Sequence, residues 1–231
     1  RHLVFLGDPG TGKSTVARLY GELLAALGVL SRGHVVEASP GSLVGPPGQR
    51  GPGRVARRTR ALFERARGGL LFLSDADVLN RDFSGGRGVG QDVVDTLLRL
   101  MEEHRDEVVV VVSGRARETT GFLADHPGLA ARLSRTVEFP SYDREELAAV
   151  FVGMAERADL LVPEATRRAL TEVVGGAEGN GHGVRALFEA SLTRQAGRIE
   201  AAALAGGNPD VSELRTLLPE DLPDGDRGLA E

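Results

Sequence analysis

Short apolar runs alternate with longer amphipathic segments through the first 140 residues of the chain. The runs are apolar at nearly every position, as expected for strands of a parallel sheet that is covered on both faces. Five strands are predicted, over residues 3–6, 35–38, 70–73, 108–112 and 136–139. Helical patterns separate them at 15–27, 57–67 and 91–104. This order predicts an α/β fold with a doubly wound, five-stranded parallel sheet, in which ligands bind at the carboxyl ends of the strands.

The pattern changes after residue 141, where the apolar strand-like runs cease. Three helices are predicted over 143–159, 163–174 and 184–205, with Asp143 as a cap and Pro163 near a helix start. We therefore expect an α/β domain at 1–141, a small helical domain at 142–205, and an acidic, proline-containing tail or linker at 206–231. The stretches 40–54 and 84–90 are rich in glycine and are predicted to be irregular loops.

The first predicted strand is followed at once by Gly7-Asp8-Pro9-Gly10-Thr11-Gly12-Lys13-Ser14, and a helical pattern begins at Thr15. This is the pattern G-x-x-x-x-G-K-[ST] of a phosphate-binding loop (P-loop). In such a loop, backbone amides surround the β-phosphate, the lysine reaches the β- and γ-phosphates, and a hydroxyl, here that of Ser14, binds Mg²⁺. The alternative, a glycine-rich surface turn, does not account for the strand before the motif and the helix after it. The residues from Asp8 to Thr15 are thus predicted to bind ATP or ADP with Mg²⁺.

The composition adds to this prediction, because the chain has 27 arginines and a single lysine, Lys13. A planar guanidinium does not fit the closed cradle that accepts a compact ammonium group, so lysine is retained where the cradle requires it. The absence of cysteine excludes disulfides and thiolate metal sites. The net charge of −5 comes from residues 206–231, where seven acids face two arginines, and the neutral remainder gives no case for a nucleic-acid partner.

No apolar run in the sequence approaches the ~18 residues that a membrane span needs, and the amino terminus does not resemble a signal peptide. We expect a soluble, cytoplasmic protein without a membrane partner. Because the sequence lacks an initiator methionine, we also expect it to be a segment of a longer chain.

Several shorter motifs, spread from His2 to about Ile199, carry a resemblance to a known family. They are Gly33-His34 with Leu43-Val44-Gly45, Gly68-Gly69, Gly90-Gln91-Asp92, Met101-Glu102 with Arg105, His126-Pro127-Gly128-Leu129, Val137-Glu138-Phe139-Pro140-Ser141-Tyr142, and Gly179-Asn180 with Val184-Arg185. With its P-loop, the chain resembles AAA+ ATPases of the CbxX/CfqX type, which include red-type Rubisco activases and the ATPases of type VII secretion. The resemblance implies a P-loop domain with a helical lid, a hexameric ring of like or unlike subunits, and ATP-driven remodelling of a protein partner.

The chain departs from this family after the third strand. Members usually carry Asp-Glu there: the Asp holds Mg²⁺ through water, and the Glu polarises the attacking water. The corresponding residues here are Ser74 and Asp75. Either Asp75 supports Mg²⁺ or the water and slow hydrolysis survives, or the site binds nucleotide with hardly any turnover. A merely polar strand end at Asp75 and Asp77 is less expected, because this edge of the sheet usually carries function. We favour weakened hydrolysis.

Four further residues are candidates by their place in the family's motifs. The small-domain Gly-Asn-Ala-Arg reads Gly179-Asn180-Gly181-His182, so His182 replaces an arginine expected at the γ-phosphate, and Arg185 follows one helical turn later. Of the family's Leu-Arg-Ser-Arg, only Arg132 remains as an arginine finger for the neighbouring subunit, and Arg115 follows the fourth strand near the first sensor's position. For the three arginines, a solvated or locally paired side chain is about equally expected.

The loop after Leu43-Val44-Gly45 carries an aromatic residue in relatives, where it grips a polypeptide. Here residues 46–54 contain no aromatic residue, which puts peptide threading in doubt. The arginines of this region could face an anionic partner, but without interleaved aromatic residues a solvated basic face is the favoured interpretation. They are Arg50, Arg54, Arg57, Arg58 and Arg60. The histidines show no metal-binding spacing, and His34 is expected to pack rather than to bind a ligand.

The sequence thus predicts a slow ATPase that remodels a protein partner. Lys13, Asp75 and a neighbour's Arg132 are the expected catalytic residues, with Mg²⁺ on Ser14 and Asp75. One alternative is a nucleotide-binding scaffold without turnover. A second is a small-molecule P-loop kinase, which is disfavoured because the helical domain comes at the end of the chain instead of being inserted in the sheet.

Overall fold

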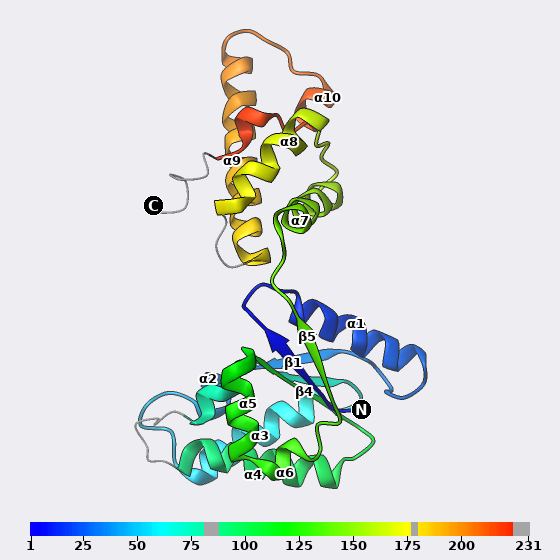
Figure 1. Ribbon diagram of the computed structural model, residues 1–231, viewed down its shortest axis with the longest axis vertical. Helices are drawn as coiled ribbons and strands as arrows, with labels where there is room; N and C mark the ends of the chain where they lie inside the picture. Colours follow the sequence, from blue (N-terminus) through cyan, green and yellow to red (C-terminus); the bar gives the residue numbers. More distant parts are fainter. Residues whose placement is uncertain (81–87, 177–179, 224–231) are drawn as a thin grey trace. The chain divides into compact units, whose positions relative to one another are not determined.

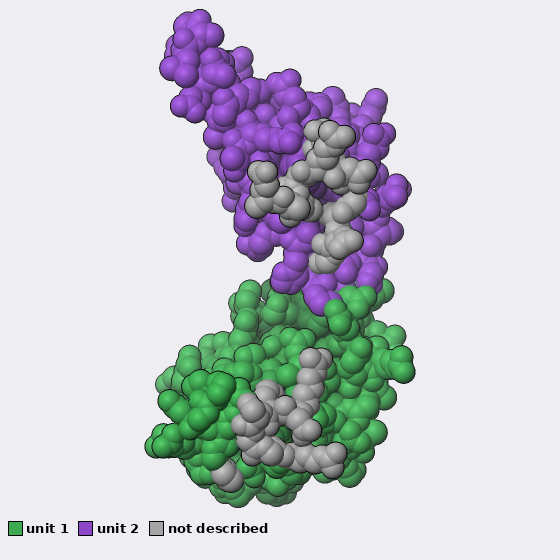
Figure 2. Space-filling view, turned by 90° about the vertical axis from the view of Figure 1, so that its left-hand side faces the viewer, with its two compact units in different colours: residues 1–8, 12–140 green, residues 9–11, 141–231 purple. Residues whose placement is uncertain are grey.

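The computed structural model describes residues 1–80, 88–176 and 180–223, and the chain divides into two compact units (Figures 1 and 2). The first unit contains residues 1–8 and 12–140, and the second contains 9–11 and 141–231. Of the loop predicted at 84–90, residues 84–87 lie outside the described part, and 88–90 begin a helix.

The first unit is built on a parallel sheet of five strands in the order β2-β3-β4-β1-β5. The strands are β1 (Leu3–Gly7), β2 (Val35–Ala38), β3 (Leu70–Leu73), β4 (Val109–Gly114) and β5 (Arg135–Phe139). The predicted α/β fold with its five-stranded parallel sheet is therefore confirmed. In this order β1 lies between β4 and β5, so the loop that follows β1 has the ends of two neighbouring strands beside it.

Alternate side chains of the central strands pack on opposite faces of the sheet, as the period of two requires. Leu71, Leu73, Val110 and Val112 belong to the core under helices α2 to α6, whereas Leu70, Phe72, Val109 and Val111 belong to the core under α1. Figure 1 shows α1 apart from the other helices of this unit. The helices are α1 (Lys13–Ala26), α2 (Pro40–Val44), α3 (Pro52–Arg65), the 3₁₀ helix η1 (Ala76–Asn80), α4 (Gly88–Glu103), α5 (Ala116–Asp125) and α6 (Pro127–Ala130).

The prediction of an irregular loop over 40–54 is wrong at both ends. Residues 40–44 form α2, capped by Ser39, whose hydroxyl accepts the amide of Ser42 at 3.3 Å. Pro52 occupies the first turn of α3. Backbone amides in this turn have no acceptor within the helix, so a residue without an N–H is tolerated there. Both prolines therefore start helices, although a glycine- and proline-rich stretch indicates a loop. Helices α5 and α6 were not predicted at all.

The second unit is helical, with α7 (Arg144–Arg157), α8 (Glu164–Val173), the 3₁₀ helix η2 (Val174–Gly176), α9 (Gly181–Leu204), α10 (Val211–Leu214) and the 3₁₀ helix η3 (Pro219–Asp221). Asp143 caps α7 as predicted, because its carboxylate accepts the amide of Glu146 at 2.8 Å and the Glu146 carboxylate accepts the amide of Asp143. The core contains Phe151 and Phe188, whose rings meet edge to face at 5.3 Å.

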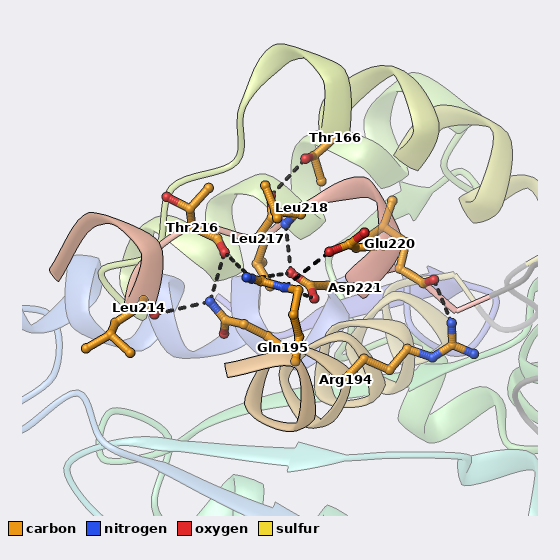
Figure 3. A network of polar contacts seen from close by, with 11 residues as sticks. Thr166, Arg194, Gln195, Leu214, Thr216, Leu217, Leu218, Glu220 and Asp221 are labelled. Atoms are coloured by element: carbon orange, nitrogen blue, oxygen red, sulfur yellow. Dashed lines mark hydrogen bonds and ion pairs between the residues drawn. The ribbon is translucent and has the colours of Figure 1, made fainter. Parts of the chain in front are cut away.

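The segment 214–222, which was expected to be tail or linker, packs against α9 (Figure 3). Leu217 is fully buried in the core of the second unit. The guanidinium of Arg198 donates to both carboxylate oxygens of Asp221, at 2.8 and 2.9 Å, and the amide of Gln195 donates to the carbonyls of Leu214 and Thr216. The acids and prolines of this segment indicated a tail or linker, but one of those acids, Asp221, is 1% exposed and ion-paired.

Replacing Asp221 by Asn should destabilise the second unit, because Arg198 would keep its charge and lose its carboxylate. Removing one partner of a buried ion pair lowers the free energy of unfolding by at least about 3 kcal/mol. We expect a loss near this lower bound because the side chain of Arg198 is 24% exposed. Urea unfolding followed by circular dichroism measures the loss. The matched control is Glu220→Gln, at an acid that is 68% exposed and 3.7 Å from Arg198. Equal losses in both variants would contradict this account.

His2 should make the first unit sensitive to acid. The backbone amide of Val110 donates to Nδ1 of His2 at 2.9 Å, which requires that this nitrogen carry no proton. Burial, the charge of the nearby amino-terminal ammonium group, and the cations of Arg132 and Arg1 together lower the pKa of His2 from 6.5 to about 4. In the unfolded chain His2 is protonated as the pH falls through about 6.5, whereas in the folded chain it is protonated only near pH 4. Stability therefore falls as the pH drops through this window.

The expected loss is about 1–2 kcal/mol, since His2 keeps partial contact with solvent. It is measured by comparing the urea midpoint at pH 7 and pH 4.5 for the wild type and His2→Asn, which keeps an acceptor that does not titrate. A pH dependence that is the same in both proteins would show that His2 is not its source.

Candidate functional site

The turn from β1 into α1 has the backbone that a P-loop requires. Gly10 and Gly12 have φ angles of 80° and 89°, in the left-handed region that glycine adopts without strain. Gly12 is the N-cap of α1 and has no side chain to occupy the amides of the first turn. These amides and the positive end of the helix dipole therefore face the loop, which suits the oxygens of a phosphate group.

Lys13 lies inside this turn, half-buried. Its ammonium group donates to the carbonyl oxygen of Gly7 at 2.7 Å and to that of Asp8 at 2.6 Å. Burial lowers the pKa of Lys13, the carboxylates of Asp75 and Asp8 act in the opposite direction, and Arg115 lowers it further. The charges of Asp75, Asp8 and Arg115 are thus all close enough to act on the P-loop lysine.

Strand order explains why these groups meet. Asp8 directly follows β1, Arg115 directly follows β4, and Asp75 is the second residue after β3. These are three consecutive strands of a parallel sheet. The Nε of Arg115 lies 3.9 Å from a carboxylate oxygen of Asp8. Ser74 is half-buried and its amide extends the pairing with β2, whereas Asp75 is exposed and has a φ of 48°, which turns the chain into η1. Lys13, Asp75 and Arg115 therefore lie on one side of the sheet, at the carboxyl ends of its strands.

The donors at this edge suit nucleotide and Mg²⁺ together. Ser14, in the first turn of α1, offers a hydroxyl oxygen and Asp75 a carboxylate, which are oxygen ligands of the kind that Mg²⁺ takes along with phosphate oxygens and water. Among the described residues, no group of three or more His, Asp or Glu side chains is arranged to hold a metal ion alone. The ion would therefore bind with the phosphates of the nucleotide.

Two residues that the sequence analysis did not select contact the P-loop segment 9–11, which belongs to the second unit. The hydroxyl of Tyr142 donates to the carbonyl of Thr11 at 3.2 Å. The side chain of Asn180 accepts the amide of Tyr142 at 3.0 Å and donates to the carbonyl of Pro9 at 3.4 Å. Both residues occur in motifs that carry the family resemblance, and membership in these motifs is the sequence feature that could have identified them. His182 and Arg185, which were selected, are exposed near the start of α9.

Arg132 lies at the opposite edge of the sheet from Lys13. It shortly precedes β5, and Ser134 two residues later donates its amide to the carbonyl of His2, just before β1. The five residues of β1, about 17 Å, separate that edge from the P-loop. Nη1 of Arg132 donates to Glu102 at 2.7 Å, and Arg105 pairs with the same carboxylate. Arg132 therefore does not reach the P-loop of its own chain.

The arginines near Leu43-Val44-Gly45 divide into two groups. Arg58 donates to the carbonyls of Val44 and Gln49, at 3.0 and 2.8 Å, and Arg50 donates to the carbonyl of Gly45. These two fasten the loop, and Gly45 lies so close to the Arg58 guanidinium that a Cβ there would be 2.4 Å from Cζ. Arg54, Arg57 and Arg60 are exposed.

The remaining expectations concern histidine and the membrane. Nε2 of His34 lies 2.8 Å from the carbonyl oxygen of Arg65, and its ring packs against Gly69, in accord with a packing role. The described helices include none that is both long and apolar enough to cross a bilayer.

Comparison with known proteins gives a consistent result. The sequence matches the ATPase family associated with various cellular activities (AAA) over residues 3–175 and an AAA lid domain over 143–230. It is 33% identical to stage V sporulation protein K of Bacillus subtilis, over 96% of this chain and 68% of that protein. It is also 33% identical to protein CbbX of Cereibacter sphaeroides, over 96% of this chain and 71% of that protein.

A third relative, a chloroplastic ribulose bisphosphate carboxylase/oxygenase activase of Cyanidioschyzon merolae, is 33% identical over 96% of this chain and 75% of its own length. Among solved structures, the FIGL-1 AAA domain superposes with a TM-score of 0.61 at 17% identity, covering 95% of this chain and 68% of that one. This last likeness bears on the fold alone.

Proposed function

The chain belongs to the AAA family of ATPases, and we propose that it binds ATP with Mg²⁺, hydrolyses it slowly, and uses the cycle to remodel a protein partner. The single observation that carries the proposal is the position of Lys13, whose ammonium group is held by two loop carbonyls at the start of α1 with Asp75 close by. On binding, phosphate oxygens would replace these carbonyls as partners of the lysine. Residues from Asp8 to Thr15 would form the phosphate cradle.

The chemical step is attack of water on the γ-phosphate in line with the leaving ADP oxygen. Mg²⁺, held with the phosphates by Ser14 and Asp75, would neutralise charge that develops on the phosphate oxygens. Lys13 stabilises the same charge from within the loop. Asp75 orients the water, but its side chain is one methylene shorter than the glutamate of the family, and Ser74 brings no charge to the metal. Slow turnover follows from both departures.

An oligomer is part of the proposal, because the AAA family generally assembles into rings. The support from this chain is the place of Arg132 at the sheet edge away from its own P-loop. From there it would serve a neighbour's site after leaving Glu102. His182 or Arg185 of the helical domain would approach the γ-phosphate, and the resemblance is the support for that role. We propose a cytoplasmic setting and no nucleic-acid partner.

A second candidate, a nucleotide-binding scaffold that does not turn over, is favoured by one observation. The half-buried position after β3 that should carry the metal-holding aspartate is Ser74. In this alternative the nucleotide stabilises an assembly, and hydrolysis is incidental.

Lys13→Ala should weaken nucleotide binding by roughly 10–100-fold, because a charge-assisted hydrogen bond contributes about 1.5–3 kcal/mol. Calorimetric titration with ATP and ADP in Mg²⁺, together with phosphate release, measures binding and turnover in the same preparation. Arg18→Ala, at an exposed cation of the same helix that pairs with Glu37, is the control and should change neither. Absence of binding by the folded wild type would overturn the proposal.

The double variant Ser74→Asp with Asp75→Glu should raise turnover by at least about tenfold, since it restores the metal-holding carboxylate and the longer base. Asp77→Glu, which also lengthens an acid beyond β3, is the control and should leave the rate unchanged. A wild type that binds ATP tightly but releases no phosphate, even when assembled, would favour the scaffold.

A further inference from the structure

The second unit contains the tip of the P-loop, residues 9–11. Each of the three carbonyl oxygens of this tip accepts a hydrogen bond from the same unit. The bonds run from Nδ2 of Asn180 to Pro9 at 3.4 Å, from the backbone amide of Gly181 to Gly10 at 3.0 Å, and from the hydroxyl of Tyr142 to Thr11 at 3.2 Å. One unit therefore holds three consecutive peptide groups of the P-loop.

These bonds also set the direction of the amides in the same peptide groups. The peptide bonds of the described chain are trans, and in a trans peptide the C=O and the N–H point in opposite directions. Because the carbonyls of residues 9–11 are bonded to the helical unit, the amides of residues 10–12 are turned the other way. This is the arrangement that a phosphate cradle requires, since a phosphate oxygen is attracted by amides and repelled by carbonyl oxygens.

Gly181 allows an unusually close approach to the P-loop. A Cβ at this position would lie 2.7 Å from the carbonyl oxygen of Gly10, and the described atoms within 4 Å of it, apart from its chain neighbours and its own helix, all belong to Gly10. The family's motif Gly-Asn-Ala-Arg has alanine at this place, whereas this chain has glycine. The first turn of α9 thus donates an amide that has no acceptor within its own helix to a carbonyl that an alanine would push away.

Asn180 has a backbone conformation that is rare for a residue with a side chain, with a φ of 55° and a ψ of −132°. Such conformations persist where surrounding contacts hold them, and they are concentrated at functional sites. Asn180 is also the N-cap of α9, yet among the described residues its side chain makes no capping bond to that helix. It accepts the amide of Tyr142 and donates to Pro9 instead. A side chain that usually caps a helix is therefore used to hold the P-loop.

We propose that Tyr142, Asn180 and Gly181 are positioning residues, which orient the amides of residues 10–12 toward the β-phosphate of the nucleotide by holding the carbonyls of the same peptides. The inference rests on the proposed nucleotide site and deepens it, because it assigns the alignment of the phosphate cradle to the helical unit. Amides that are aligned in advance need not be ordered when the nucleotide binds, which favours affinity. Loss of one holding contact should weaken nucleotide binding and leave the helical core intact.

The first test compares two alanine variants of α9, by calorimetric titration with ADP and ATP in Mg²⁺ and by urea unfolding. Gly181→Ala should weaken binding by about tenfold or more, because the new Cβ displaces the carbonyl of Gly10 and, in the same peptide, the amide of Thr11 that would contact a charged phosphate. Its urea midpoint should change little, since the clash is confined to Gly10. Gly197→Ala is the matched control: among the described residues a Cβ there meets nothing within 4 Å outside its own helix, so binding should be unchanged.

The second test removes a single hydroxyl group. Tyr142→Phe deletes the donor to Thr11 and keeps the ring that packs against the core of the second unit, so binding of ADP and ATP should weaken by about threefold. Tyr20→Phe is the control, because the Tyr20 hydroxyl also donates to a backbone carbonyl, that of Arg1 at 3.1 Å. This variant should bind nucleotide like the wild type.

Four outcomes would count against the inference. Gly181→Ala that binds ADP as tightly as the wild type would overturn it, as would equal affinities of the two phenylalanine variants. A loss of binding that is matched by a loss of stability would assign these contacts a structural role and would also overturn it. In these three cases the wild type still binds nucleotide and the proposed function stands. Failure of the folded wild type to bind ATP and ADP would overturn both.

Discussion

The ammonium group of Lys13, enclosed by the backbone of the turn between β1 and α1, is the contact on which the rest of the site depends. The turn is possible because Gly10 and Gly12 adopt left-handed conformations that a side chain would strain. It is held in place because β1 is a central strand, hydrogen-bonded to β4 and β5. Asp8, Asp75 and Arg115 act on this lysine because they lie close to it. The order of the strands brings them there.

The sheet and the P-loop could be predicted from the sequence because both depend on local pattern. Five apolar runs bounded by turns define the strands, and a glycine-rich motif between a strand and a helix defines the loop. The packing of the strands in the structure follows directly: alternate valines of β4 belong to the two opposite cores. Asp143 was identifiable as a cap for the same reason, since the capping contact spans three residues.

What could not be predicted depends on contacts between distant residues. In the sequence Asp221 is one acid among seven in a predicted tail or linker, and only the structure shows that it is buried and paired with Arg198, 23 positions earlier. Asn180 and Tyr142 are recognisable only as parts of motifs, and their bonds to residues 9–11 span more than 130 positions. Arg58 was grouped with arginines expected on a solvated basic face. Its guanidinium instead donates hydrogen bonds to the carbonyl oxygens of Val44 and Gln49.

The two arginines lie at opposite ends of the parallel strands, and this sets their distance from the P-loop. A cation that follows a parallel strand lies at the carboxyl edge with the P-loop, and one that precedes a strand lies a strand's length away, about 17 Å for β1. Arg115 is of the first kind and lies on the P-loop side of its own sheet. Arg132 is of the second kind, so the role of arginine finger that we propose for it requires a site in another copy. Positive charge at the phosphates would thus come from two sources. One is present in the isolated chain, and the other, Arg132 of a neighbour, requires assembly. A chain so arranged would hold its nucleotide before it assembles, because Lys13, the cation that we propose to bind phosphate, is its own, whereas the proposed finger arginine belongs to a neighbour.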